Sequence, residues 1–365
     1  MIPIAKPSIG KEEIAAVAKV LESGMIAQGP KVREFEEKFA AFCGSRYGVA
    51  VNSGTAALHC ALHSLGIREN DHVITTPFTF IASANVILMQ RAKPLFVDID
   101  EDTFNINPEN LEGPSMKKAK ALLAVDLYGQ MCDYEAIQDK LHKQCVLIED
   151  AAQAVNASYK GKKAGSIGSA STFSFYATKN ITCGEGGMLT TNSQECAETA
   201  KLYRQHGRSK MSQYDYADLG YNYRTTDIMA AILLEQLKKL DGITKKRIEN
   251  AHYLSSHLKK IKGIKVPVVK KECVHVYHQY TIRITNECKK SRDEIMKMLA
   301  AQGISANVYY PHPLHYWKHY QNFGFKKGDF PIAEKACTEV LSLPVHPHLT
   351  EENLMHIINT LEQAE

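Results

Sequence analysis

The 365-residue sequence lacks the features that mark membrane, secreted or disordered proteins. No apolar run approaches the roughly 18 residues that a membrane span requires. The N-terminal stretch MIPIAKPSIGKEE has no basic region followed by an apolar one, so it does not resemble a secretory signal. Low-complexity tracts and long charge runs are also missing, at 44% hydrophobic and 23% charged residues. We therefore expect a globular, cytoplasmic protein.

Paired cysteines and a strong charge of one sign are missing as well. The nine cysteines are scattered singly with no C-x-x-C pair, which fits reduced cytosolic thiols better than a disulfide framework or a zinc site. The formal net charge is only +4, which does not indicate a nucleic-acid-binding surface. Basic clusters at 238–247 and 268–272 are interpreted as solvated helix faces, with local basic patches as the alternative.

The apolar runs that are present indicate an α/β fold. Four short runs lie at 72–76, 94–100, 121–127 and 145–150, separated by stretches of helical character such as 83–92 and 134–143. Continuous apolar strands that alternate with helices predict a mainly parallel sheet covered on both faces. Ligands of such sheets bind beyond the carboxyl ends of the strands, so the residues directly after each run are functional candidates.

Length and texture predict two domains, because single cores stop growing near ~250 to 300 residues. We expect a large domain over residues 1–240 and a smaller α+β domain over residues 241–365. Near the N-terminus, KEEIAAVAKVLESG and GPKVREFEEKFAAFCG predict two amphipathic helices. Ile14, Val17 and Leu21 lie at helical spacing in the first of them.

A turn of small residues follows the short apolar strand YGVAV. The segment NSGTAAL places Ser53, Gly54 and Thr55 where a helix begins. Free backbone N–H groups and the helix dipole at such a position favour an anion such as phosphate. Small-residue turns before helices are common, so a plain helix cap is the alternative.

The apolar run VLIED ends in two carboxylates, Glu149 and Asp150, and Gln153 follows. A carboxylate at this position needs a cation or a hydrogen-bond donor, because burial without one is costly. A protonated pyridine nitrogen would satisfy Asp150. A nearby arginine or a helix N-terminus would do so too, and these are the alternatives.

The segment STFSFYATKNITCGEGGMLTT places Lys179 between an aromatic run and three glycines. Most lysines are solvated, so a surface lysine after a strand is the alternative. A lysine whose pKa is lowered by burial or by a nearby cation forms a Schiff base with an aldehyde cofactor. Lys179, Asp150 and a phosphate-binding turn are together what pyridoxal phosphate demands. The glycines that would let the backbone turn beside a bulky ring are Gly184, Gly186 and Gly187.

Ordered segments over nearly the whole length of the sequence match those of a known family. They are IAQGPKVREFEEKFA, VNSGTAALHCAL, VITTPFTFIASANVIL, VDIDEDTFNINPENLE, LIEDAAQA, STFSFYATKNITCGEGGMLTT, GYNYRTTDIMAAI and SLPVHPHLTEE. The resemblance is to the DegT/DnrJ/EryC1/StrS family of nucleotide-sugar aminotransferases. It implies the aspartate aminotransferase-like fold (fold type I), with a large α/β domain, a smaller α+β C-terminal domain, and pyridoxal 5'-phosphate as cofactor.

The resemblance also implies roles around the cofactor ring. Lys179 is the catalytic residue, which binds the cofactor and, once displaced by substrate, moves the proton as a base. Asp150 pairs with the pyridinium nitrogen, and Gln153 touches the side of the ring that carries the oxygen. Phe80, in PFTFIAS, matches the aromatic residue that stacks on the ring; a core strand residue is the alternative.

Phosphate binding is implied for a second group of residues. Thr55, the backbone of Gly54 to Ala56, and Ser174 match the phosphate-holding residues of the family. Asn222 and Arg224, in GYNYR, match residues that reach into the site of a neighbouring subunit, where Asn222 contacts phosphate. The active unit implied is a homodimer with shared active sites.

Two positions depart from the family pattern. Asp126, in AVDLYGQ, stands where histidine is common, and Tyr309, in ANVYYPHPLH, occupies a place often held by histidine. We expect Tyr309 and Tyr310 to contact the sugar. The nearby histidines lack metal-ligand spacing on one helix, so no metal site is expected. They are His312, His315, His319, His346 and His348.

The function implied is transamination of a nucleotide-linked keto sugar, with glutamate as amino donor, for surface polysaccharide or glycoconjugate synthesis. The segment YYPHPLH resembles a type associated with amination at C3, so a 3-keto sugar on UDP or dTDP is favoured. A 4-keto, perosamine-type substrate is the alternative. Lys179 argues against the branch of the family in which histidine replaces lysine and the reaction is a dehydration. A non-catalytic regulatory or binding protein on the same fold is the remote alternative, and neither nucleic acid nor membrane is an expected partner.

Overall fold

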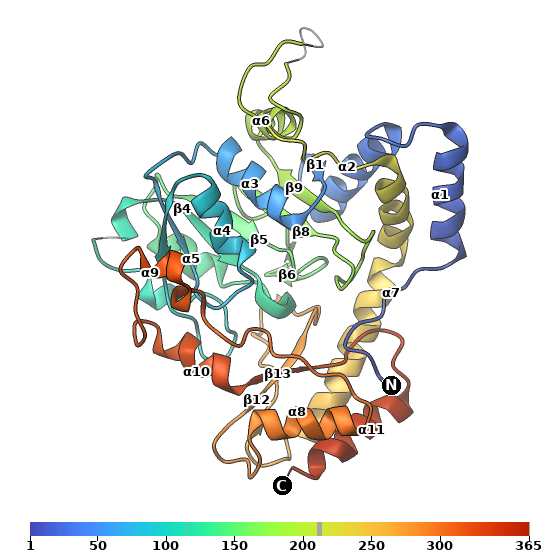
Figure 1. Cartoon of the computed structure of the whole chain (residues 1–365), viewed down its shortest axis with the longest axis vertical. Helices are drawn as coiled ribbons and strands as arrows, with labels where there is room; N and C mark the ends of the chain where they lie inside the picture. The colour runs from blue at the N-terminus through green and yellow to red at the C-terminus, as the bar shows by residue number, and fades with distance from the viewer. Residues whose placement is uncertain (115, 210–213, 365) are drawn as a thin grey trace.

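The computed structural model describes residues 1–114, 116–209 and 214–364. Its centre is a seven-stranded sheet in the order β1-β9-β8-β5-β4-β2-β3 (Figure 1). The strands are β1 (Tyr47–Val51), β2 (His72–Thr75), β3 (Lys93–Phe96), β4 (Ala119–Val125), β5 (Val146–Asp150), β8 (Ala170–Ser174) and β9 (Gly187–Thr191). Within this sheet β9 is antiparallel to both neighbours, and the pairs from β8 to β3 are parallel. The predicted α/β class and mainly parallel sheet are therefore confirmed.

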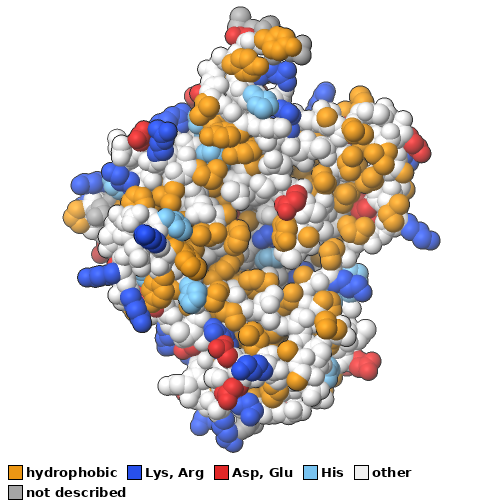
Figure 2. All heavy atoms as spheres, in the orientation of Figure 1, with side chains coloured by type: hydrophobic (Ala, Val, Ile, Leu, Met, Phe, Trp, Pro, Cys, Tyr) orange, Lys and Arg blue, Asp and Glu red, His pale blue; other side chains and the backbone are white. Residues whose placement is uncertain are grey.

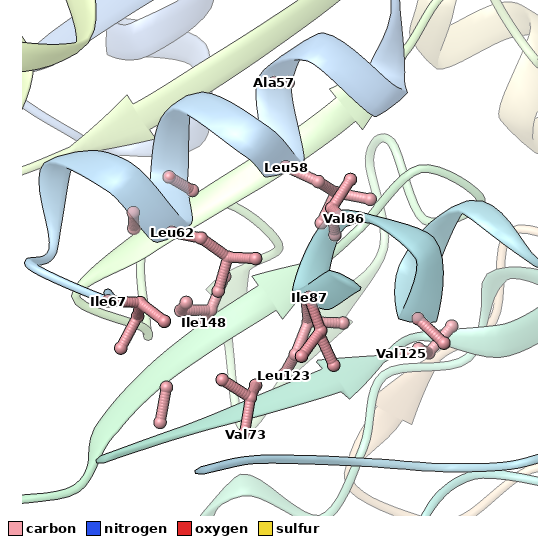
Figure 3. Close-up of a cluster of buried hydrophobic side chains, with 14 of the residues drawn as sticks. Ala57, Leu58, Leu62, Ile67, Val73, Val86, Ile87, Leu123, Val125 and Ile148 are labelled. Carbon is pink, nitrogen blue, oxygen red and sulfur yellow. The ribbon is translucent and has the colours of Figure 1, made fainter. Parts of the chain in front are cut away.

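Helices cover both faces of this sheet, because its strands are apolar on both sides. One face packs against α3 (Gly54–Ser64), α4 (Ala82–Met89) and α6 (Gln194–Arg204), and the other against α2 (Pro30–Cys43), α5 (Tyr134–Lys140) and α7 (Asp227–Leu258). Along β4, Leu123 and Val125 point to the first face, whereas Leu122 and Ala124 point to the second. Figure 3 shows the first core, in which α3 and α4 lie over β4 and β5.

The helix α1 (Lys11–Ser23) forms as predicted, but its apolar side chains do not join the core. Ile14 and Leu21 are 66% and 55% exposed, whereas Glu13 is buried. Glu13 accepts hydrogen bonds from Lys239 and Gln236 of α7, so α1 packs on α7 through a polar contact. Figure 2 shows hydrophobic side chains gathered on the surface over α1.

The C-terminal part adds a three-stranded sheet of β10 (Ile264–Lys265), β12 (Tyr280–Ile284) and β13 (Val340–Leu343), with α8 (Arg292–Ala301) and α11 (Glu351–Glu362). A third small sheet joins β6 (Ser158–Tyr159), β7 (Lys162–Lys163) and β11 (Cys273–Val274). Short helices complete the chain: 3-10 turns at Pro108–Asn110, Met116–Lys118, Leu127–Gly129 and Leu314–Tyr316, then α9 (Lys318–Gln321) and α10 (Pro331–Glu339).

The two predicted domains are joined by more than one segment. The helix α7 runs without a break through residue 240. Leu314, Tyr320 and Ala333 belong to the core cluster of the large sheet, and Ile2 packs in the core of the small one. The domain boundary at residue 240 stays a prediction.

Two further features are the character of the helices and the state of the cysteines. Among the described residues, helices with the length and apolar character of a membrane span are missing. The nine cysteines all lie in the described part of the chain and are free thiols, as their scattered spacing predicted.

Candidate active site

A cavity of about 720 Å³ opens where β4, β5 and β8 end. Val125, Asp150 and Ser174, the last residues of these strands, line its floor together with the start of α3. Side chains from the C-terminal part of the chain close its other side. Its position at the carboxyl ends of parallel strands is the one expected for a ligand site in this class of fold.

The structure brings most of the predicted site residues into this single cavity. Those that line it are Gly54, Thr55, Phe80, Asp150, Gln153, Ser174, Lys179, Tyr309 and Tyr310. Ala56 is buried in α3, and its N–H donates to Ser53 Oγ at 3.1 Å. Asn222 and Arg224 lie outside the lining, and Arg224 borders a separate hollow of about 480 Å³. Their predicted reach into a neighbouring subunit stays a prediction.

Asp150 is a buried carboxylate whose two oxygens are held by donors. Ser83 Oγ donates to Oδ2 at 2.6 Å, and the Ala152 N–H donates to Oδ1 at 3.2 Å. Burial raises the pKa of Asp150, whereas the two donors and the Lys179 ammonium lower it. The donors favour the ionised form, which a cationic ring nitrogen in the cavity would complement.

The neighbouring carboxylate, Glu149, faces the opposite side of β5 and is not in the cavity lining. It accepts hydrogen bonds from the Gly165 N–H at 2.9 Å, the Ile167 N–H at 2.6 Å and Ser171 Oγ at 2.8 Å. Successive side chains of a strand alternate between faces, so only one of the two adjacent acids can serve the cavity. Glu149 fixes the loop between β7 and β8 instead.

Lys179 follows a turn in which its N–H donates to the Tyr176 carbonyl at 2.9 Å. Its side chain is partly buried and lines the cavity, so it is not a freely solvated surface lysine. Burial lowers the pKa of Lys179 to about 8, and the nearby Asp150 opposes this shift. A substantial fraction of the amine is therefore neutral near pH 7 to 8, which is the form that attacks an aldehyde and accepts a proton.

The first turn of α3 and the end of β8 form a cradle for an anion. Ser53 caps the helix, and the first backbone N–H groups of a helix, here those of Gly54 and Thr55, have no partner inside it. Ser174 lies directly against Gly54, where a Cβ would approach Ser174 Cβ to 2.9 Å. The backbone N–H groups, the helix dipole, and the hydroxyls of Thr55 and Ser174 are together suited to bind a phosphate group.

Two of the glycines after Lys179 serve different purposes. Gly184 has a φ of +92°, so it makes the sharp turn for which glycine is suited. A Cβ on Gly187 would lie 2.2 Å from the Ser53 carbonyl oxygen. This glycine therefore allows β9 to approach the backbone of the anion cradle.

Aromatic and amide groups line the upper part of the cavity. Phe80 is 55% exposed in the loop before α4, which excludes the alternative of a core strand residue. Its ring centroid lies 6.2 Å from that of Tyr310. Gln153 is oriented by two contacts, since its Oε1 accepts from the Tyr128 N–H at 2.9 Å and its Nε2 donates to Tyr310 Oη at 3.2 Å.

Asp126, which departs from the family pattern, lies beneath the cavity and not in its lining. Its Oδ1 accepts hydrogen bonds from the Cys132 N–H at 2.8 Å and from Tyr134 Oη at 2.9 Å. Burial, and next the Glu149 carboxylate, raise the pKa of Asp126 well above its usual range. Through these two hydrogen bonds Asp126 supports the loop after β4.

Sequence reasoning missed seven polar residues of the lining, which are Thr79, Ser83, Tyr176, Thr178, Glu185, His278 and Gln279. Ser83 carried a usable signal, because it is a small polar residue at the start of an apolar helix, three positions after Phe80. His278 and Gln279, just before β12, carried no such signal. Their place in the cavity depends on contacts with segments more than a hundred positions earlier in the chain.

The residues of the cavity fit pyridoxal phosphate. Asp150 would hold the ring nitrogen, the start of α3 with Ser174 the phosphate, and the Lys179 amine the aldehyde carbon. Phe80 is exposed where a planar ring could stack on it. The ring nitrogen, the phosphate and the aldehyde of the cofactor thus each have a complementary group among the described residues.

Comparison with known proteins agrees with this chemistry. The model of the DegT/DnrJ/EryC1/StrS aminotransferase family matches residues 7–362. The spore coat polysaccharide biosynthesis protein SpsC of Bacillus subtilis is 40% identical over 374 residues, which cover 99% of this chain and 96% of SpsC. GDP-perosamine synthase of Caulobacter vibrioides is 38% identical over 366 residues, covering 100% of this chain and 98% of that enzyme.

Solved structures extend the likeness to three dimensions. Spr1654 of Streptococcus pneumoniae, described as a sugar aminotransferase and solved in its PLP form, superposes with a TM-score of 0.94. The two sequences are 30% identical, and the match covers 100% of this chain and 98% of Spr1654.

Proposed function

The chain belongs to the DegT/DnrJ/EryC1/StrS family of pyridoxal phosphate-dependent sugar aminotransferases, and from this premise we propose that it aminates a keto sugar carried on a nucleoside diphosphate. The observation that carries the proposal is the meeting of Lys179, Asp150 and the N-terminus of α3 in one cavity. These groups come from three separate segments. Their convergence is what the cofactor and a proton transfer beside it require.

The residues of the cavity have different roles in the proposed reaction. Pyridoxal phosphate, when bound, supplies an electron sink that makes the C–H bond next to the amino group acidic. With the cofactor in place, Lys179 Nζ would be the base that moves this proton in a 1,3-shift, because its lowered pKa leaves part of the amine neutral. Asp150 would hold the protonated ring nitrogen, and the Ser83 hydroxyl favours the ionised form of Asp150 against burial, which raises its pKa. The same groups act in both half-reactions, with glutamate as donor and the sugar ketone as acceptor.

The favoured substrate carries its ketone at C3 and is linked to UDP or dTDP. Tyr309 and Tyr310, from the YYPHPLH segment, line the cavity on the side of the C-terminal sheet, which supports their contact with the sugar. The alternative is a 4-keto, perosamine-type sugar, and the likeness to GDP-perosamine synthase favours it. The similarity to SpsC supports a product used in surface polysaccharide.

The proposal includes a homodimer that shares its active sites. The exposed apolar side chains of α1 and the loop after it are suited to contact a second copy. In a single chain, Asn222 and Arg224 do not line the cavity that they are expected to serve. A neighbouring subunit would give both residues a cavity to reach.

The test is the visible absorption of the purified protein loaded with pyridoxal phosphate. A UDP-linked 3-amino sugar, a dTDP-linked 4-amino sugar and a GDP-linked 4-amino sugar are added separately. Loss of the band of the lysine-bound cofactor with the 3-amino compound alone establishes the reaction and the carbon. Loss with a 4-amino compound alone keeps the reaction and overturns C3. A protein that never acquires the band contradicts the mechanism.

Lys179→Ala should abolish turnover, because no other described lysine or arginine lines the cavity. Lys163→Ala is the matched control, since Lys163 lies over the Phe42 ring, 3.5 Å from its centroid and outside the cavity. Retained transamination by the Lys179 variant, measured as glutamate-dependent formation of the amino sugar, would rule out the assigned role.

A further inference from the structure

A short segment of the C-terminal part enters the cavity from the side opposite the large sheet. Residues 275–279, here named the strap, connect β11 to β12. Two of them, His278 and Gln279, line the cavity beside Tyr309 and Tyr310. The strap therefore contributes to the wall that closes the site above Lys179.

Contacts with the 3-10 turn after β4 hold the backbone of the strap. The Val276 N–H donates to the Gly129 carbonyl at 2.9 Å, and the Gln279 N–H donates to the Tyr128 carbonyl at 3.2 Å. Gly129, with a φ of +106°, makes this approach possible, because a Cβ there would lie 2.8 Å from Val276 Cγ2. Asn180, the residue after Lys179, donates from Nδ2 to the Val276 carbonyl at 3.3 Å.

A buried arginine holds the strap from its other side. Arg247 of α7 is 4% exposed and donates from Nη1 to the Tyr277 carbonyl at 2.9 Å and to that of His278 at 3.5 Å. Burial lowers the pKa of Arg247 to about 10, and no carboxylate of the described residues acts against this shift. Burial of a cation without an anionic partner costs desolvation free energy, and the hydrogen bonds of Arg247 to the strap compensate part of that cost.

His278 is the strap residue with unused hydrogen-bonding capacity. It is 6% exposed, and its Nδ1 is buried with no hydrogen-bond partner among the described residues. Burial, together with the charges of Lys179 and Arg247, lowers the pKa of His278 well below its ordinary value. The imidazole is therefore neutral at physiological pH and offers one donor and one acceptor.

We propose that His278 is a sugar-recognition residue, which hydrogen-bonds a hydroxyl group near the keto carbon, and that Arg247 is the positioning residue that holds the strap in place for this contact. The proposal rests on the proposed function. A neutral group that both donates and accepts is complementary to a hydroxyl. The neighbouring strap and tyrosine side chains, Gln279, Tyr309 and Tyr310, are also uncharged and polar. A carboxylate of the amino donor would instead require a cation, which His278 does not supply.

The experiment compares the two half-reactions in His278→Phe and His278→Gln. Each variant, loaded with pyridoxal phosphate, is mixed in single turnovers with glutamate and, separately, with one amino sugar. That sugar is the UDP-, dTDP- or GDP-linked probe that removes the band of the lysine-bound cofactor in the wild type. The phenyl ring keeps the bulk and loses the polar atoms, whereas glutamine restores a donor and an acceptor. The matched control is His346→Phe, since His346 is buried with both ring nitrogens unpartnered but lies outside the cavity lining.

We expect His278→Phe to lower the ratio of the sugar rate constant to the glutamate rate constant by about tenfold, through a weaker apparent affinity for the sugar. In His278→Gln the ratio recovers to within about threefold of the wild type. Arg247→Gln, which loses the charge but can still donate, should lower the same ratio, whereas His346→Phe leaves it unchanged. If Arg247→Gln does not fold, the His278 pair alone decides the role of His278.

Two outcomes overturn the inference, and they differ from failure of the proposed function. An unchanged ratio in His278→Phe, or an equal loss in both half-reactions, excludes sugar recognition by this residue. If His346→Phe lowers the ratio of the two rate constants as much as His278→Phe does, the effect comes from a general loss of packing and not from sugar recognition. Failure of the proposed function is seen in the wild type, which would respond to glutamate and to none of the nucleotide sugars, and that result removes both proposals.

Discussion

Ser83 offers the sharpest test of how the cavity holds its cofactor. Ser83 is 2% exposed, and its hydroxyl donates to Asp150 Oδ2 at 2.6 Å as one of two donors to that carboxylate. The other donor, the Ala152 N–H, is longer at 3.2 Å. Ser83→Ala therefore removes the shorter contact to a group that must stay ionised in order to pair with a cationic ring nitrogen.

The magnitude follows from the charge of the acceptor. A hydrogen bond to a charged group contributes about 1.5 to 3 kcal/mol, and about 1.4 kcal/mol corresponds to a factor of ten in affinity. We expect Ser83→Ala to bind pyridoxal phosphate about tenfold to a hundredfold more weakly than the wild type. Removal of the donor also raises the pKa of Asp150 further, so the deficit should grow as the pH falls.

The assay titrates cofactor-free protein with pyridoxal phosphate at several pH values and follows the visible band. Ser171→Ala is the matched control, because Ser171 Oγ makes a similar bond of 2.8 Å to Glu149, the adjacent carboxylate that faces away from the cavity. Ser171→Ala should lower the melting temperature and leave cofactor affinity within about twofold of the wild type. Equal affinities for both variants and the wild type, at every pH, would refute the reasoning.

Two further predictions concern Lys179 and the surface of α1. Because the pKa of Lys179 is lowered to about 8, cofactor uptake by the empty protein should accelerate with rising pH and level off above about 8; a stopped-flow midpoint near the ordinary lysine value of about 10.4 would contradict this. Ile14→Glu places a charge on the exposed apolar side of α1, and in a dimer that buries this side it should halve the mass measured by light scattering and lower activity. Lys19→Glu, an exposed change on the same helix, should alter neither, and an unchanged mass in Ile14→Glu would show that this side of α1 is not in the interface.

The comparison of sequence with structure separates local from long-range information. The strands β1, β2, β4 and β5 could be predicted, because buried strands form continuous apolar runs in the sequence. The cap at Ser53, the acid at the end of β5 and the position of Lys179 were also predictable, since each stands at a fixed offset from such a run. Their convergence follows from topology, because the ends of parallel strands meet at one edge of the sheet.

The sequence by itself therefore determined the α/β class, the order of the elements and the main chemistry of the cavity. Only the tertiary structure decided which side chains complete it. Ser83 meets Asp150 across 67 positions, and Arg247 meets the strap across 30. Periodicity also predicted an apolar face on α1, but not that Glu13 would be buried together with Val20, because the burial of Glu13 depends on the ion pair with Lys239. Such choices are made by packing between distant segments, and no local pattern of residues encodes them.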